Sequence, residues 1–191
     1  MGQHCSRYAR EIVAFHRTID RITVRRKPGD ERRGILAAGP LRMPCALGRS
    51  GTTIFKREGD GATPVASMAL VELWHRGGRL DRPKSRLPTR RVRPGVDGWC
   101  DAPKHAAYNR HVRLPFPASA ESLARDDRLY DVVVVLDWNL ARRARGRGSA
   151  IFFHIAKEYY RPTEGCVAIS PADMRRLAPH LSSRTRLTVI R

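Results

Sequence analysis

The feature that most constrains the fold is a run of four consecutive valines, Val132 to Val135, inside the segment 130–138. Valine is stiff at χ1 and favours the extended backbone, so this segment is predicted to be a strand. A strand with one wet face alternates apolar and polar residues, whereas an unbroken apolar run is typical of a strand buried on both faces. The sequence therefore predicts a central strand that is covered on either side.

The remaining pattern indicates short strands joined by turns that contain glycine or proline. Strands are predicted at 22–25, 34–38, 41–47, 52–55, 65–75 and 185–190. The segments 34–38 and 41–47 flank Gly39-Pro40 and are expected to form a hairpin. A helix is predicted from the N-cap Ser170 to about Leu181, and a second short one over 119–125 with Ser119 as its cap. The expectation is a mainly β fold with one or two short helices.

The length of 191 residues fits one domain of ordinary size. We expect that domain over 21–191. Residues 1–20 carry only a weak helical pattern, in which Tyr8, Ile12, Phe15 and Ile19 lie on one face. They are interpreted as an N-terminal extension, either helical or disordered. No apolar run reaches the length of a transmembrane helix, so no transmembrane segment is predicted.

The chain is strongly basic, with 37 Lys and Arg against 18 Asp and Glu, a net charge of +19. Such a surface attracts polyanions, and nucleic acid is one candidate partner. The arginines, however, are scattered in pairs along the whole chain and do not form one stripe, with few aromatic residues between them. Composition alone therefore leaves nucleic acid, anionic glycopeptide and an anionic membrane surface open.

Four cysteines are present: Cys5, Cys45, Cys100 and Cys166. None lies in a C-x-x-C pair, and no Cys/His spacing matches a zinc site, so neither metal nor cofactor is predicted. Spacing cannot show whether Cys45 and Cys100 form a disulfide. Two buried thiols are the simpler interpretation.

The segment 148–170 carries the candidate chemistry. One apolar run ends near His154, and a second begins after Gly165-Cys166, twelve positions later. If these two runs pair as antiparallel strands, an imidazole base and a thiol nucleophile can come within hydrogen-bond reach. The backbone N–H groups of Gly165 and Cys166 are then candidate oxyanion donors. A buried core histidine beside a buried cysteine is the alternative that residue types and spacing leave open.

The motifs GSAIFFH at 148–154 and PTEGCVA at 162–168 resemble the catalytic signature of L,D-transpeptidases of the YkuD type. Further segments share the resemblance: 44–51, 56–64, 98–101 and 108–110. The resemblance implies a β-sandwich of mixed sheets in which Cys166 is the nucleophile and His154 the general base and acid. It also implies that the backbone carbonyl of Ile155 orients the imidazole.

The implied reaction is acyl transfer on the stem peptides of peptidoglycan. Cys166 would attack a tetrapeptide stem, release D-Ala, and pass the acyl group to an amine or to water. Candidate substrate-binding residues are Arg147, Thr163, Trp99 and Asn109. Many relatives carry Arg or Asn two positions after the cysteine, where this chain has Ala168, and Arg147 is the candidate replacement. The resemblance also implies carbapenems as covalent inhibitors.

Two other functions stay open at this point. One is a basic nucleic-acid-binding β-domain, and the other a cell-wall cysteine peptidase or amidase, although the usual Cys-then-His order of such hydrolases is reversed here. A catalytically inactive relative is a further alternative, suggested by Ala168. The substrate implies the periplasm or cell envelope. Residues 1–10 show no apolar signal-peptide core, which leaves a cytoplasmic location open.

Overall fold

A computed structural model describes residues 18–191, and the predicted helix or disorder of the N-terminal extension lies almost wholly outside the described residues. The fold is mainly β, as predicted. Its strands are β1 (Arg21–Lys27), β2 (Asp30–Ala38), β3 (Leu41–Ala46), β4 (Thr52–Thr53), β5 (Thr63–Pro64), β6 (Ser67–His75), β7 (Thr89–Arg91), β8 (Asp97–Cys100), β9 (Arg110–Arg113), β10 (Ala120–Ser122), β11 (Val132–Leu136), β12 (Phe152–Ile155), β13 (Val167–Ile169) and β14 (Arg186–Ile190). Its helices are α2 (Pro171–Leu177) and the short 3₁₀ turns η2 (Glu158–Tyr160) and η3 (Ala178–His180).

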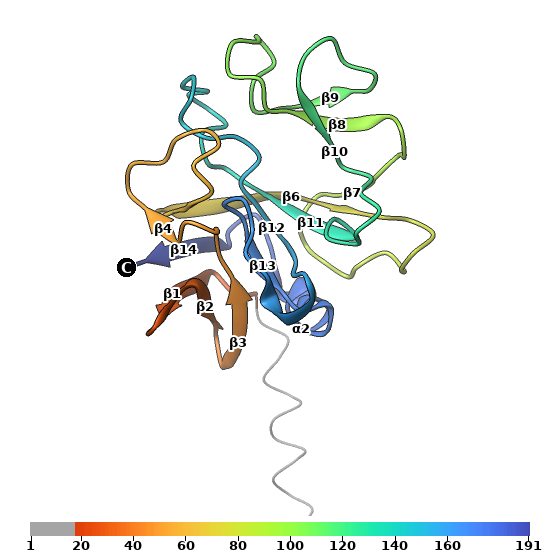
Figure 1. Cartoon of the computed structure of the whole chain (residues 1–191). Coiled ribbons are helices and arrows are strands. Elements are labelled where there is room, and N and C mark those ends of the chain that lie inside the picture. The colour runs from red at the N-terminus through yellow and green to blue at the C-terminus, as the bar shows by residue number, and fades with distance from the viewer. Residues whose placement is uncertain (1–17) are drawn as a thin grey trace, which may run out of the picture.

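The main sheet has nine strands in the order β11-β12-β13-β3-β2-β1-β14-β6-β7. It is mixed, since β1 pairs parallel with β14 while the β2–β3 hairpin is antiparallel, as predicted. Strand β6 also pairs with β11, so the sheet closes on itself around the interior. A smaller sheet, β10-β8-β9, lies beyond β11 and β6 in the upper part of Figure 1.

The valine strand β11 is buried on both faces, as predicted, because its alternate residues enter two different apolar clusters. Val132 and Val134 belong to the interior of the closed sheet. Val133 and Val135 point into a second cluster with Trp99, which comes from the small sheet. Alternation along a strand sends successive side chains to opposite faces. The run is therefore apolar throughout because both sides of β11 are covered by other parts of the chain.

The predicted helix over 119–125 is wrong. Residues 120–122 form strand β10, which pairs antiparallel with β8, with Glu121 opposite Trp99. The Ser122 hydroxyl accepts a hydrogen bond from the Ala124 N–H at 3.2 Å, a local turn in place of a helix cap. Serine favours caps and turns alike, and here pairing with β8 decides between them.

The C-terminal helix is confirmed. Ser170 caps α2 by accepting a hydrogen bond from the Asp173 N–H at 3.1 Å, and Pro171 begins the first turn. Met174 and Leu177 point into the interior cluster, and η3 continues the chain to His180. None of the helices within residues 18–191 is long and apolar enough to cross a membrane. Cys45 and Cys100 are both buried free thiols.

The predicted antiparallel pairing of the His154 and Cys166 segments is also wrong. Strands β12 and β13 run parallel, with His154 opposite Ala168. Parallel neighbours need a crossover, and residues 156–166 with the η2 turn supply it. Cys166 directly precedes β13, so it lies level with the start of β12. His154 and Cys166 still lie on the same side of the sheet. Ala168 is the neighbour of His154 in the pairing, and Cys166, two positions before Ala168, points to the same face.

Candidate active site

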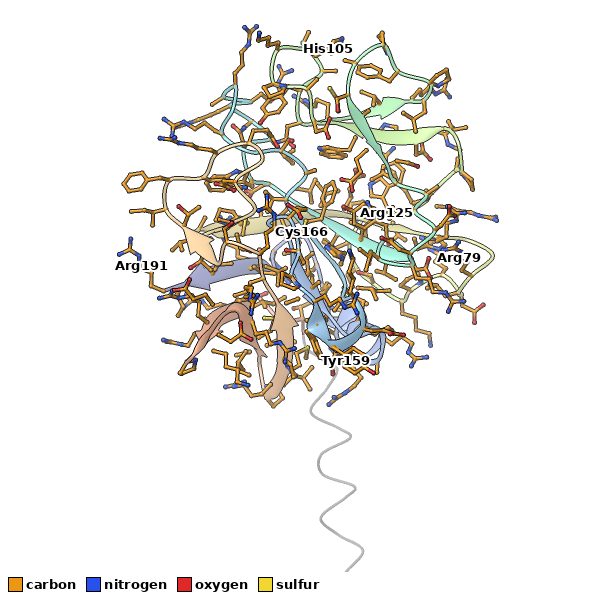
Figure 2. The ribbon with its side chains drawn as sticks, viewed as in Figure 1. Arg79, His105, Arg125, Tyr159, Cys166 and Arg191 are labelled. Carbon is orange, nitrogen blue, oxygen red and sulfur yellow. The ribbon has the colours of Figure 1, made fainter. Side chains whose placement is uncertain are left out.

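A pocket of about 460 Å³ opens between the closed sheet and the small sheet, and Cys166 and His154 both line it. Figure 2 shows Cys166 near the centre of the molecule, below the small sheet. Most of the remaining wall comes from the loop 56–59, from the crossover 157–164, and from the segment 121–130. The pocket therefore joins parts of the chain more than one hundred residues apart.

Cys166 is 7% exposed, and its thiol is held by two backbone groups. It donates to the carbonyl of Ala150 at 3.3 Å and accepts from the N–H of Phe152 at 3.3 Å. Burial raises the pKa of Cys166 to about 12, while the Phe152 N–H and the charge of Lys56 act in the opposite direction. The resting residue is thus a neutral thiol that the site holds in one orientation.

His154 is 3% exposed, and its ring is fixed by one short contact. Its Nδ1–H donates to the Ile155 carbonyl at 2.8 Å. A carbonyl can only accept, so the proton is on Nδ1, and Nε2 is left as an acceptor. The ring also meets the edge of Tyr130, with centroids 5.3 Å apart. Burial lowers the pKa of His154 to about 4, which keeps the imidazole neutral at physiological pH.

Within residues 18–191 no hydrogen bond joins the thiol of Cys166 to the ring of His154, since the thiol donates to Ala150. Thiolate and imidazolium are both disfavoured by the same burial. The arrangement suits a proton transfer that accompanies attack on a substrate, not a resting ion pair.

The turn before Cys166 is shaped by hydroxyl groups. Thr163, a candidate substrate-binding residue, lines the pocket and donates through Oγ1 to the Cys166 carbonyl at 2.7 Å. The Gly165 N–H, a predicted oxyanion donor, donates to Thr163 Oγ1 at 3.2 Å. Gly165 has φ +132°, and a Cβ there would lie 2.9 Å from the Ala62 carbonyl oxygen. Only glycine therefore fits at this position without moving the backbone.

Trp99 and Asn109 do not line the pocket, as substrate-binding residues would. They are 4% and 1% exposed and lie behind its wall. Asn109 Oδ1 accepts from Trp99 Nε1 at 3.0 Å and from the N–H of Ala150 at 3.1 Å. Ala150 has the left-handed φ of 50° and supplies the carbonyl that holds the thiol. Asn109 and Trp99 therefore position the Cys166 thiol from behind.

Arg147, the proposed replacement for a polar residue at position 168, lines a neighbouring pocket of about 530 Å³ together with Trp138 and Lys56. Its carbonyl accepts from Trp138 Nε1 at 2.9 Å. Ala168 itself is fully buried opposite His154. The structure thus separates Arg147 from the pocket that holds the thiol.

The pocket is also lined by residues that were not predicted as site residues, among them Glu121, Arg125 and Tyr130. Glu121 Oε1 accepts from the Tyr130 hydroxyl at 2.8 Å and from Arg125 at 3.0 Å. Burial raises the pKa of Glu121 despite these donors. The only sequence signal was the position of Tyr130 at the head of the valine run. Glu121 and Arg125 carried none, because they lie in the segment that was predicted as a helix.

Residues 35–190 match the family described as the L,D-transpeptidase catalytic domain, YkuD. Among solved structures, Bd1075 of Bdellovibrio bacteriovorus is 14% identical, over 93% of this chain and 49% of its own, with a TM-score of 0.47. L,D-transpeptidase 1 of Mycobacterium tuberculosis is 11% identical over 89% of this chain and 62% of its own, with a TM-score of 0.40. L,D-transpeptidase 3 of the same organism, in complex with a faropenem-derived adduct, is 11% identical over 89% of this chain and 60% of its own, with a TM-score of 0.40.

The chain spans less than two thirds of each of these structures. No curated protein matches it.

Proposed function

Because this chain belongs to the L,D-transpeptidase catalytic domain family, we propose that it is a cysteine acyltransferase that acts on the tetrapeptide stems of peptidoglycan. Cys166 is the nucleophile and His154 the base. The observation that carries the proposal is the bond from His154 Nδ1–H to the Ile155 carbonyl in the pocket that also holds the thiol. It leaves Nε2 as the acceptor that a neutral thiol needs.

In the first step the sulfur of Cys166 attacks the carbonyl carbon of the stem peptide bond that precedes the terminal D-Ala, while the thiol proton passes to His154 Nε2. The pKa values of about 12 and about 4 favour transfer during attack over transfer before it. The thiol must leave the Ala150 carbonyl to do this. The resulting oxyanion is placed near the N–H groups of Gly165 and Cys166. Gly165 can donate to it only if its bond to Thr163 is released.

The tetrahedral intermediate then collapses. The C–N bond breaks, His154 returns its proton to the leaving amino group of D-Ala, and a thioester remains on Cys166. An amine or a water molecule attacks the thioester, gives its proton to His154, and releases the thiol. The first acceptor gives a cross-link and the second a tripeptide stem. The pocket has both charge signs near the thiol, from Lys56 and Arg125 and from Glu58 and Glu121, which suits a stem peptide with amino and carboxylate groups.

We expect Cys166→Ala to abolish both D-Ala release from tetrapeptide muropeptides and the covalent adduct that a carbapenem forms with the wild-type chain. Chromatography of the muropeptides and intact-protein mass spectrometry measure the two. The matched control is Cys100→Ala, which removes another buried thiol that lies outside the pocket. A wild-type chain that forms no adduct and turns over no muropeptide would refute the proposal.

We further propose that the reaction takes place in the cell envelope and that carbapenems inhibit it, because the chain belongs to the L,D-transpeptidase catalytic domain family. A basic nucleic-acid-binding domain is the alternative supported by the net charge of +19. It predicts salt-sensitive binding to DNA or RNA that Cys166→Ala leaves unchanged. A cell-wall cysteine peptidase or amidase would instead cut internal stem bonds, and the position of the released fragment distinguishes it.

A further inference from the structure

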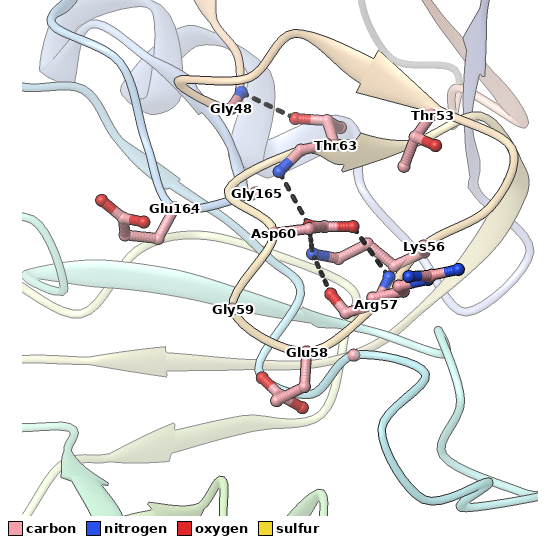
Figure 3. Close-up of polar contacts among 12 residues, drawn as sticks. Gly48, Thr53, Lys56, Arg57, Glu58, Gly59, Asp60, Thr63, Glu164 and Gly165 are labelled. Carbon is pink, nitrogen blue, oxygen red and sulfur yellow. Dashed lines mark hydrogen bonds and ion pairs between the residues drawn. The ribbon is translucent and has the colours of Figure 1, made fainter.

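Lys56 is a buried cation in the wall of the candidate active site. The residue is 4% exposed, yet it lines the pocket that holds Cys166 and His154. Its Nζ donates to the Arg57 carbonyl at 3.1 Å and forms a short ion pair with Asp60. Figure 3 shows both contacts inside the loop that precedes β5. A lysine is almost never buried to this extent without a specific partner.

The loop is built to hold this ion pair in place. The Asp60 carboxylate also accepts from the N–H of Arg57 at 2.7 Å and from the N–H of Ala62 at 2.9 Å. Three donors therefore converge on one carboxylate, which orients it toward Lys56 (Figure 3). The two hydrogen bonds and the lysine hold the pKa of Asp60 below its usual value. The carboxylate consequently stays charged at neutral pH.

Two glycines leave space for the Lys56 side chain and its terminal ammonium group. A Cβ at Gly148 would lie 3.0 Å from Cγ and from Cε of Lys56, so this glycine leaves room for the lysine stem. A Cβ at Gly165 would lie 3.4 Å from Lys56 Nζ, which places the ammonium beside the residue that precedes Cys166. The loop, the stem and the two glycines together bring one positive charge into the wall of the pocket that holds the thiol.

We propose that Lys56, in addition to Arg125, supplies a fixed positive charge that stabilises the Cys166 sulfur when it becomes negative, and that Asp60 partly offsets the charge of Lys56. The inference rests on the proposed role of Cys166 as nucleophile. Lys56 transfers no proton and forms no bond in this role; it acts on the sulfur through its electric field. A nearby positive charge favours the ionised form of a thiol, and Lys56 acts in that direction on the pKa of Cys166.

The competing explanation is that the ion pair between Lys56 and Asp60 only holds the loop in place. The two explanations predict different directions of change in Cys166 reactivity when Asp60 is neutralised. If the pair only holds the loop, removing either partner damages the site in the same direction. If Lys56 acts as a charge, removing it destabilises the thiolate, whereas neutralising Asp60 leaves the lysine less compensated and stabilises the thiolate. The Arg57 carbonyl and the walls at Gly148 and Gly165 keep the lysine in place when the carboxylate is gone.

The test is the rate at which iodoacetamide alkylates Cys166, measured by peptide mass spectrometry at several pH values between about 7 and 10. This rate reports on the thiolate, because the thiolate is the form that reacts. Lys56→Met is expected to slow alkylation about tenfold at each pH, and Asp60→Asn to accelerate it. Arg57→Met is the matched control. It removes one charge from the adjacent, exposed position, and screening should keep its effect below about twofold.

Rates that change in the same direction in Lys56→Met and Asp60→Asn would overturn the proposal, as would a Lys56→Met rate equal to that of Arg57→Met. If Lys56→Met does not fold, Asp60→Asn decides alone: a faster rate supports the proposal and an unchanged or slower one refutes it. Alkylation needs no turnover. A wild-type chain without muropeptide activity would therefore refute the role of Cys166 in catalysis, while the order of alkylation rates would still report on Lys56.

Discussion

Among single residues, Asn109 does more for the candidate site than its distance from the pocket suggests. Its side-chain oxygen accepts from the Trp99 indole and from the N–H of Ala150, and its amide donates to the carbonyl of Trp138 at 3.0 Å. Ala150 adopts a left-handed φ of 50°, which costs a non-glycine residue about 1 kcal/mol. Asn109 therefore holds Ala150 in a strained backbone conformation. The carbonyl of Ala150 in turn accepts the hydrogen bond that orients the Cys166 thiol.

We expect Asn109→Ala to destabilise the chain by about 2–6 kcal/mol, since the Trp99 indole N–H and the Ala150 N–H lose their acceptor at about 1–3 kcal/mol each. Denaturant unfolding measures the loss. D-Ala release should fall as well, because the carbonyl that orients Cys166 is no longer held. A loss of stability below about 1 kcal/mol would show that water replaces the side chain and that Asn109 has no positioning role.

At the scale of elements, β12 and β13 place the His154 imidazole and the Cys166 thiol, and α2 packs below them (Figure 1). Apolar runs in the sequence predicted both strands, and the N-cap and proline predicted the helix. The pairing direction was not predictable, because it depends on the path of the crossover 156–166. The β10 segment shows the same limit: Ser119 and Ser122 fit a helix start equally well, and only β8 beside them selects a strand.

Removal of the α2 N-cap tests whether the stability of this helix affects the geometry of the candidate active site. Ser170→Ala takes away the acceptor for the Asp173 N–H and is expected to cost about 1 kcal/mol of unfolding free energy. Thermal or denaturant unfolding checks the value. The rate of Cys166 alkylation should stay at the wild-type level, because Ser170 does not line the pocket. A large change in that rate would instead show that α2 controls the geometry of β12 and β13.

Across the whole molecule, burial of the site couples its chemistry to stability. His154 has its pKa lowered to about 4, whereas an imidazole in the unfolded chain titrates near about 6.5. Between these values the unfolded chain binds a proton that the folded chain does not. Stability therefore falls as the pH falls from about 6.5 to about 4, by roughly 3 kcal/mol from this residue, and is unaffected by it above that window.

The His154→Gln variant tests this coupling. Its unfolding free energy, measured by denaturant at several pH values, should fall less steeply than that of the wild type between about pH 6.5 and 4. Carboxylates also titrate in this range, so the difference between the two curves is the quantity to compare. Parallel curves would mean that the folded chain admits the proton and that the imidazole is not held neutral.

By itself the sequence determined the mainly β class, the strand at the valine run, the capped helix, and the choice of His154 and Cys166 as candidates. These depend on local propensity, hydrophobic pattern and motif, which neighbouring residues carry. Only the tertiary structure decided the closure of the sheet through β6 and β11, the parallel pairing of β12 with β13, and the position of Lys56 beside Gly165. Each of these is a contact between segments distant in sequence or a balance of burial and hydrogen bonding, which no local pattern records.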